Sequence, residues 1–452
     1  MQSFWRGQNV GARALRASAL TIFQTGASTL LRLISNLILT RLLFPEAFGL
    51  MSLVFVFITG LGLFSDIGLR DAIIRQKPGD RTALDTIWTM QVIRGGLMWG
   101  AACIIAWPVS ALYGEPVLQI LLPVVAISLL IDGFKSTKEP CAIRDLQIGR
   151  LTALLLLAQG LSLIFMALMA WWLHSVWALA FGSLFSACVH VALIQVGLPG
   201  PNNRFCWDWG VVRKTLGFGI FIFFSTIATF FVLHGSQMIL GLYVSLAVFG
   251  IYGIANSFAT LPGMVAQSLS SNVLMPLYRL KSPNEAIENQ PKVFKARRLV
   301  GLLGIGITIC LALIGDWLVV LLFDPRYHLA GPILVLIAAC SLPVMAFKGV
   351  QQSLIAHGDS RSHLIVIAAT AALQLTALAF LLPVYSVGAV ALAPMLAGLA
   401  TYPLLAHFVA RYRTWDARGD LCLIALALLL LLLIGWLKAD TLQQVFAIPL
   451  ER

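Results

Sequence analysis

Charged residues are scarce in this chain. They make up 11% of its 452 residues, whereas apolar residues make up 59% and the mean hydropathy is +0.90. Soluble domains carry about 25% charged residues, so the composition excludes an ordinary soluble domain. Apolar stretches of about 20 residues recur along the whole length, each long enough to cross a bilayer as a helix. We therefore predict an all-α integral membrane protein, because a helix satisfies its own backbone polar groups within lipid.

The motifs of metal, nucleotide and hydrolase chemistry are also missing. The seven cysteines stand apart from one another, and no CxxC, CxxH or HExxH motif occurs, so neither a disulfide framework nor a zinc site is predicted. No nucleotide fingerprint and no GxSxG elbow occurs either. We predict that the chain needs no metal or cofactor and is not an enzyme. Its net charge of +12 is explained by basic loops facing anionic lipid rather than by nucleic acid.

The apolar pattern predicts thirteen membrane-spanning helices. Most lysines and arginines fall in loops on one side, whereas opposite loops such as "LYGEPV" and "PVYSVG" carry none. The positive-inside rule then places the N-terminus in the cytoplasm, and the odd number of spans places the C-terminus outside. The predicted spans are 17–43, 47–69, 85–112, 116–134, 151–173, 176–197, 215–240, 246–274, 299–323, 331–355, 363–384, 387–409 and 420–437.

Two short stretches of the chain resemble each other. "ILTRLLFPEAFGLMSL" (38–53) and "ILGLYVSLAVFGIYGI" (239–254) both begin with Ile-Leu and both carry Phe-Gly ten residues later. Each joins the end of one predicted span to the start of the next, and six spans separate them. A parallel repeat of this kind predicts two six-helix lobes related by a pseudo-twofold axis along the membrane normal. The predicted parts are a lobe at 1–200, a linker at 201–212, a lobe at 213–410, and an accessory thirteenth helix with a tail at 411–452.

The stretch "SNLILTRLLFPEAFGLMSLVFVFITGLGLFSDIGLRDAIIRQ" (35–76) resembles the signature of a known family. This is the polysaccharide transporter family, with its Wzx-like oligosaccharide flippases, of the multidrug/oligosaccharidyl-lipid/polysaccharide flippase superfamily. The resemblance extends over roughly residues 14–410. It departs from many relatives near the end of the seventh span, where Ser236 or Gln237 stands in place of an aspartate. The matching positions are Arg41, Leu42, Leu43, Pro45, Phe48, Gly49, Asp66, Gly68, Leu69, Ala72 and Ile74.

The resemblance implies a transporter of the bacterial inner membrane. Its cargo would be an oligosaccharide linked to a polyprenyl diphosphate of the undecaprenyl type, a precursor of O-antigen, capsule or exopolysaccharide. Alternating access would move it from the cytoplasmic to the periplasmic leaflet. The implied partners are this lipid, the bilayer, and a polymerase and glycosyltransferases of the same pathway. One alternative is a cation-coupled multidrug exporter, which the lack of any acid in the first span disfavours. Another is a polysaccharide polymerase or ligase, which would need a larger outside loop than 323–331.

A few charged side chains fall within the predicted spans. A charge at the bilayer centre costs about 2.5–3.5 kcal/mol on insertion scales, so each should face water or a partner. We predict a cationic cavity between the lobes, in which arginine would grip phosphate oxygens with two hydrogen bonds. The structural alternative pairs Arg32 with Asp66, and pairing is favoured for Asp66 with Arg70, for Asp132 with Lys135, and for Asp316. The candidate cavity residues are Arg32, Arg94, Lys348, Asn256 and Gln267, and the structural or coupling candidates are Asp66, Arg70 and Arg41.

Overall fold

The computed structural model describes residues 10–65, 68–75, 80–145, 147–281, 283 and 286–451, without the side chains of 10–19, 22, 71, 75 and 216–222. Every regular element in this described part is a helix, which confirms the predicted all-α class. The chain divides into two compact units, Met1–Phe223 and Phe224–Arg452. Residues 201–208, where the sequence predicts a linker, form no helix, and the boundary between the units falls further along, within α10 (Trp209–Leu240).

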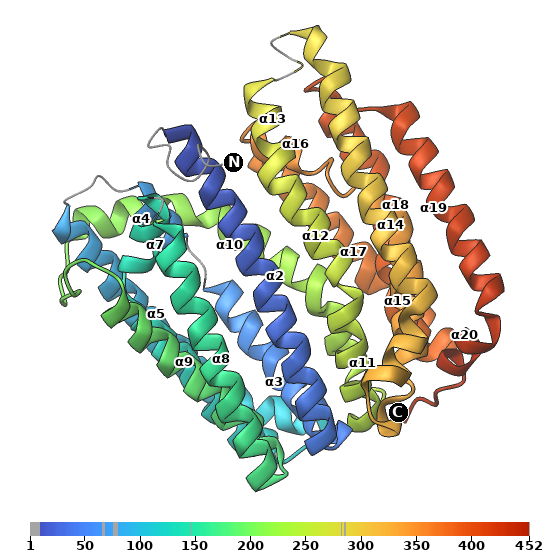
Figure 1. Ribbon diagram of the computed structural model, residues 1–452, viewed down its shortest axis with the longest axis horizontal. Helices are drawn as coiled ribbons and strands as arrows, with labels where there is room; N and C mark the ends of the chain where they lie inside the picture. The colour runs from blue at the N-terminus through green and yellow to red at the C-terminus, as the bar shows by residue number, and fades with distance from the viewer. Residues whose placement is uncertain are drawn as a thin grey trace. The chain divides into compact units, whose positions relative to one another are not determined.

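The first unit is built from paired helices (Figure 1). The long helices α5 and α6 pack side by side, as do α8 and α9, while α2 packs along α8. The helix α3 contacts α5, α6 and α9 and so lies among them. The bounds are α2 Val10–Leu42, α3 Pro45–Phe64, α4 Leu69–Arg75, α5 Arg81–Tyr113, α6 Leu118–Gly133, α7 Lys138–Arg144, α8 Ile148–Leu173 and α9 Val176–Gly197.

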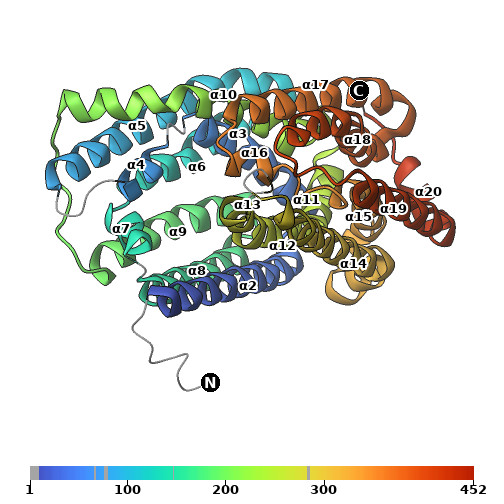
Figure 2. The same cartoon turned by 90° about the horizontal axis from the view of Figure 1, so that it is seen from above.

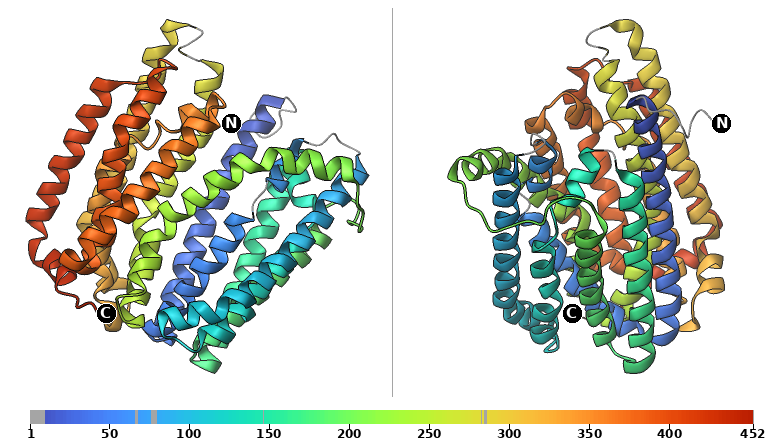
Figure 3. Two further views of the ribbon diagram at one scale, coloured as in Figure 1. Left: turned by 180° about the vertical axis from the view of Figure 1, so that it is seen from behind. Right: turned by 60° about the vertical axis from the view of Figure 1, so that its left-hand side comes forward.

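In the second unit, as in the first, long helices that follow each other in the chain pack as pairs. The helices α14 and α15 pack together, and α17 packs back along α18 (Figure 3). The core of this unit centres on α15, which also contacts α11, α18 and α19. Its helices after α10 are α11 Leu246–Ala259, α12 Leu261–Leu269, a π-helical turn η1 Ser270–Leu274, α13 Met275–Leu280, α14 Gln290–Leu322, α15 Ala330–Met345, α16 Gln352–Ala356, α17 Ser360–Tyr385, α18 Ala389–Ala410, α19 Ala417–Leu437 and α20 Ala439–Phe446.

Both copies of the repeated stretch mark a helix end and a helix start. The first copy ends α2 at Leu42 and begins α3 at Pro45, whose proline suits the first turn of a helix. The second ends α10 at Leu240 and begins α11 at Leu246, where the Ser245 hydroxyl accepts a hydrogen bond from Val248 N at 3.3 Å. The local reading of these stretches is therefore confirmed, whereas the pseudo-twofold arrangement of lobes stays a prediction.

Ten helical stretches of the described chain are long and apolar enough to cross a membrane, or eleven if α6 and α7, bent by 56°, form one span. One of the ten, Ser360–Ala410, contains both α17 and α18, which the sequence counts as two spans. The structure is thus that of a multi-span membrane protein. The count of thirteen and the sidedness of the termini stay predictions.

Two glycines bring α5 and α6 into close contact. A Cβ atom added at Gly95 would lie 2.8 Å from the carbonyl oxygen of Leu129, and one added at Gly133 would lie 3.1 Å from the carbonyl oxygen of Gln91. Small residues at a helix crossing let the two backbones approach in this way. Arg94, which precedes Gly95 on α5, therefore lies near the end of α6.

The C-terminal span α19 is joined to the rest of the second unit by a buried ion pair. Arg297 on α14 is 3% exposed, and its Nη2 donates to the Asp420 carboxylate of α19 at 2.6 Å. Tyr402 on α18 donates its hydroxyl to the same carboxylate at 2.8 Å. The helix α19 also packs against α14 and α15 (Figure 2). The consecutive helices α18 and α19 and the more distant α14 therefore meet at one carboxylate.

Candidate functional site

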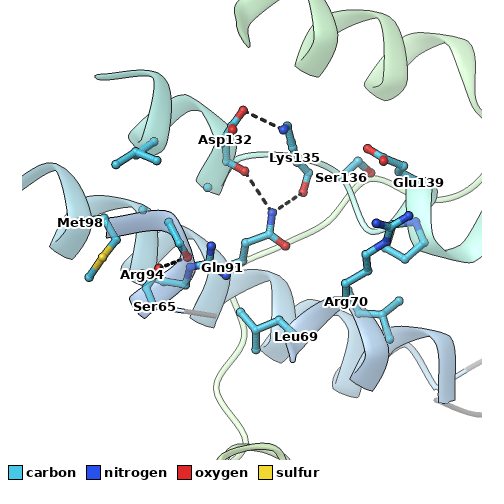
Figure 4. A pocket seen from close by; sticks show the side chains of 16 residues that line it. Ser65, Leu69, Arg70, Gln91, Arg94, Met98, Asp132, Lys135, Ser136 and Glu139 are labelled. Carbon is cyan, nitrogen blue, oxygen red and sulfur yellow. Dashed lines mark hydrogen bonds and ion pairs between the residues drawn. The ribbon is translucent and has the colours of Figure 1, made fainter. Parts of the chain in front are cut away.

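A pocket of about 360 Å³ opens within the first unit, where α3, α4, α5, α6 and α7 come together (Figure 4). Its volume falls within the range of about 300–1,000 Å³ that is usual for small-molecule sites. The lining is mixed, with charged, amide, hydroxyl and apolar side chains. The lining residues are Gly62, Ser65, Leu69, Arg70, Ile73, Gln91, Arg94, Gly95, Met98, Leu129, Asp132, Gly133, Lys135, Ser136, Glu139 and Pro140.

Among the described residues that line this pocket, positive charge exceeds negative charge. Arg70 comes from α4, Arg94 from α5 and Lys135 from the turn after α6, whereas Asp132 and Glu139 are the two carboxylates of the lining. The three cations and two anions leave one excess positive charge when all five are ionised. An apolar surrounding strengthens the field of such a charge relative to water. The arrangement therefore favours an anion, and two of its cations are arginines able to bind phosphate in a bidentate manner.

The side chain of Gln91 joins α5 to the end of α6. Its amide nitrogen donates to the backbone oxygen of Asp132 at 3.1 Å and of Lys135 at 3.4 Å (Figure 4). The Lys135 ammonium in turn pairs with the Asp132 carboxylate at 2.9 Å. The predicted pairing of these two residues is confirmed, although both also line the pocket. Because Asp132 is 42% exposed, the pair is partly hydrated and adds little to stability.

Asn203, which lies outside the pocket, forms hydrogen bonds with the segment that carries the lining residue Ser136. The Asn203 side-chain oxygen accepts hydrogen bonds from Ser136 Oγ at 3.2 Å and Thr137 N at 3.1 Å, and its nitrogen donates to Thr137 Oγ1 at 2.7 Å. The same nitrogen reaches the Asp85 carboxylate of α5 at 3.4 Å, and that carboxylate also accepts from Arg204 N at 3.2 Å. The non-helical segment 201–208 is thereby tied to the wall that carries Ser136.

Arg70 and Arg94 are the sequence candidates that the structure brings together in the pocket. Arg94 is half-buried, whereas Arg70 is exposed. Arg32 and Arg41 lie on α2 with exposed side chains and do not line this pocket. Asp66 falls outside the described residues, so its pairing with Arg32 or Arg70 stays a prediction.

The remaining sequence candidates belong to the second unit. Lys348 lies in the break between α15 and α16 and points toward α12, since a Cβ atom added at Gly263 would lie 2.9 Å from its Nζ. Asn256 is half-buried on α11, and Gln267 is exposed on α12. Their roles in substrate binding stay predictions.

Ser236 and Gln237 on α10 both contact other polar side chains. The Ser236 hydroxyl accepts from Gln374 Nε2 of α17 at 3.0 Å, and that nitrogen also reaches the backbone oxygen of Val232 at 3.1 Å. The neighbouring Gln237 side chain lies 2.9 Å from His234 Nδ1. Ser236 and Gln237, the two residues at which the sequence departs from the family signature, thus both have polar partners here.

Several site residues were not anticipated from the sequence. Gln91, Ser136 and Glu139 line the pocket without having been singled out, and the sequence assigned Lys135 only a structural pair. Their common signal is position: polar residues cluster at 132–139 directly after an apolar span, in "DGFKSTKE". The partner of Asp316 was also unforeseen, since its carboxylate pairs with Lys438 at 2.8 Å, beyond α19.

Asp416 lies outside the spans, in the segment between α18 and α19, and its pKa is shifted. Burial alone would raise the pKa of Asp416, but the Arg298 guanidinium and the Gly419 N–H stabilise the ionised form and hold the pKa below its usual value. Arg298 donates from Nε at 2.6 Å and from Nη2 at 2.8 Å, a bidentate geometry. Asp416 thereby caps α19 as an anion.

The chain is similar in sequence to proteins of polysaccharide biosynthesis. A family model described as "Polysaccharide biosynthesis protein" matches residues 38–332. The succinoglycan biosynthesis transport protein ExoT of Rhizobium meliloti (strain 1021) is 22% identical over 330 residues, covering 71% of this chain and 66% of the relative. The lipopolysaccharide biosynthesis protein WzxC of Escherichia coli (strain K12) is 21% identical over 321 residues, covering 69% and 63%. The chain thus spans just under two thirds of the length of these relatives.

Solved structures show the same fold at low sequence identity. The lipid II flippase MurJ in an inward closed conformation aligns with a TM-score of 0.67 and 14% identity, covering 96% of this chain and 97% of that one. A multidrug resistance MATE family transporter of the MOP superfamily, inward-facing, aligns with a TM-score of 0.66 and 15% identity, covering 86% and 96%. The family match covers more than half of the chain, so the resemblance is confirmed: the chain belongs to the family described as "Polysaccharide biosynthesis protein", and the solved structures show that it shares their fold.

Proposed function

We propose that this chain is a flippase for an oligosaccharide linked to a polyprenyl diphosphate. It would move the precursor of a surface or secreted polysaccharide between the leaflets of the bacterial inner membrane, from the cytoplasmic to the periplasmic side, by alternating access. Three findings support this reading: the family match, the similarity to a protein named for succinoglycan biosynthesis transport, and the fold shared with a lipid II flippase. No bond is made or broken in such a step.

The pocket of the first unit is the observation that carries the proposal. In the described part of its lining, Arg70, Arg94 and Lys135 outnumber the two carboxylates, which suits the diphosphate of the cargo. Gln91 and the hydroxyls of Ser65 and Ser136 add hydrogen-bonding groups of the kind that bind sugar hydroxyls. The polyprenyl tail, being apolar, can remain in lipid while the headgroup binds.

Further features of the mechanism belong to the same proposal. The N-terminus would lie in the cytoplasm and the C-terminus in the periplasm. Arg32, Lys348, Asn256 and Gln267 would contact the cargo at other points of its path. Arg41, Asp66 and Arg70 would hold or couple the moving helices. A polymerase and glycosyltransferases would supply and consume the cargo. The undecaprenyl type of lipid is proposed because it is what the resemblance implies.

The test exchanges one pocket cation. In a strain lacking the chromosomal copy, Arg94→Ala should abolish surface polysaccharide and cause the lipid-linked precursor to accumulate in the inner leaflet. Arg94→Lys should retain partial export, because it keeps the charge and loses the bidentate fork. Arg150→Ala is the matched control, since Arg150 is an exposed arginine of the same unit outside the pocket. Normal export by Arg94→Ala, with the protein present in the membrane at its usual level, would refute the proposed site.

A multidrug exporter is the second candidate, because its fold is shared with the MATE family transporter. Such a pump needs a carboxylate that exchanges with a cation, and α2 contains no acidic residue. The same deletion strain separates the two functions. Loss of drug resistance with normal polysaccharide would favour the exporter, whereas loss of polysaccharide with unchanged resistance favours the flippase.

A further inference from the structure

A histidine lies directly behind one wall of the pocket. His190 projects from α9 and its Nε2 is 3.4 Å from an oxygen of Glu139 on α7. This nitrogen is buried, and among the described residues no hydrogen bond reaches it. Glu139 itself lines the pocket (Figure 4). The imidazole therefore lies behind the carboxylate, close enough to change how that carboxylate acts on the pocket.

We propose that His190 is a proton-binding site linked to anion binding in the pocket. When the ring is neutral, the charge of the Glu139 carboxylate is balanced by the pocket cations alone. A second ring proton would give the imidazolium, whose charge would pair with that carboxylate across the observed 3.4 Å. The proposal deepens the proposed function, because it rests on the pocket being the site that receives the anionic headgroup.

The charges around Glu139 decide the sign of the linkage. It is faced by Arg70 from α4, by Lys135 from the turn before α7 and by His190 from α9. The remaining neighbour, α8, carries one ionisable side chain, Arg150, in its first turn. When a protonated His190 neutralises the Glu139 charge, the attraction of Glu139 for Arg70 and Lys135 becomes weaker. The pocket then attracts an anion more strongly, so proton binding and anion binding favour each other.

Linkage of this kind is reciprocal. If protonation of His190 tightens anion binding by some factor, anion binding tightens proton binding by the same factor. The protein should therefore take up a proton from solvent when an anion enters the pocket. Because a histidine binds a proton more readily at lower pH, the affinity for an anion should fall as the pH rises.

The experiment uses the purified full-length protein in detergent micelles. Sulfate is the probe, because it carries the charge of a phosphate dianion but does not itself titrate near neutral pH. Calorimetry at several pH values, repeated in buffers of different ionisation enthalpy, measures both the affinity and the protons taken up. We expect sulfate to bind about tenfold more weakly at pH 8 than at pH 5.5, a change equivalent to about 1.4 kcal/mol.

Two variants should change the affinity in opposite directions. His190→Gln should bind sulfate weakly at every pH, since the proton site is gone and the Glu139 charge remains. Glu139→Gln should bind it tightly at every pH, since the opposing charge is gone. Neither should take up the proton. His174→Asn is the matched control, because His174 lies exposed at the end of α8 outside the pocket, and it should keep the normal pH dependence.

The outcomes separate this linkage from the proposed function. Sulfate binding that depends on Arg94 but has the same pH dependence in His190→Gln would overturn the linkage and leave the anion site standing. Weakening by both variants alike would also overturn it, because it would indicate a merely structural pair. No sulfate binding, or binding unaffected by Arg94→Ala, would remove the anion site and with it this inference.

Discussion

The ion pair between Arg297 and Asp420 should be among the most sensitive points of the second unit. We expect Asp420→Leu to destabilise the protein by about 3–5 kcal/mol, because it leaves the Arg297 charge buried without an anion. Both side chains are 2% exposed, so water cannot replace the lost partner. The Tyr402 hydroxyl would lose its acceptor as well, adding about 1–3 kcal/mol if nothing else moves.

Thermal unfolding in detergent, followed by circular dichroism, measures this loss. Asp316→Leu is the matched control, because Asp316 pairs with Lys438 in the same unit but both side chains are more than a fifth exposed. Its loss should cost only about 1 kcal/mol or less. The double variant Arg297→Met with Asp420→Leu should recover much of the stability, since an apolar pair of similar volume can replace a buried ion pair. A double variant no more stable than Asp420→Leu alone would refute the reasoning.

Three further predictions concern packing, pH and the pocket wall. Gly95→Ala should force α5 and α6 apart, destabilise the protein by about 1–3 kcal/mol and lower export. Gly96→Ala is the control, because a Cβ atom added there would have no neighbour nearer than 4.0 Å, and it should change neither stability in unfolding assays nor export. The pKa of Asp416 is lowered, so the ionised carboxylate should stabilise the protein fully above pH 3.8 and lose this effect as the pH falls through the lower pKa of the folded state. In unfolding scans, the difference in stability between the wild-type protein and Asp416→Asn should therefore shrink at low pH. A difference that stays unchanged at low pH would contradict this. Asn203→Ala should release Ser136 and weaken sulfate binding measured by calorimetry while the protein remains folded, and unaltered affinity would remove Asn203 from any positioning role.

The sequence predicted the parts of the protein that depend on local pattern. Apolar length predicted the helices, and the repeated stretches correctly marked helix ends at Leu42 and Leu240. The family signature was also readable, because it lies in one continuous segment. The cost of a charge within a span directed attention to Arg94, which does line a pocket. In each case the information was contained within one helix or one turn.

Contacts between distant segments could not be predicted in this way. The pocket takes its lining from α3 to α7, and short helices such as α4 and α7 interrupt the regular pattern of spans. Arg297 and Asp420 are 123 residues apart, and the arginine lies just before the predicted span 299–323. Hydropathy and charge give the depth of a residue in the membrane. They do not give its partner on another helix, which is why His190 and Glu139 went unnoticed.

The most direct test of the account asks where the cargo binds. A photo-crosslinking amino acid in place of Met98, which lines the pocket, should capture the lipid-linked oligosaccharide in living cells, and pyrophosphate should compete for capture in isolated membranes. The same group in place of Val196, which is 85% exposed on α9, controls for contact with bulk lipid. Capture at Met98 that depends on Arg94 is the expected result. Capture at Val196 with none at Met98 would contradict the claim that the cationic pocket receives the headgroup.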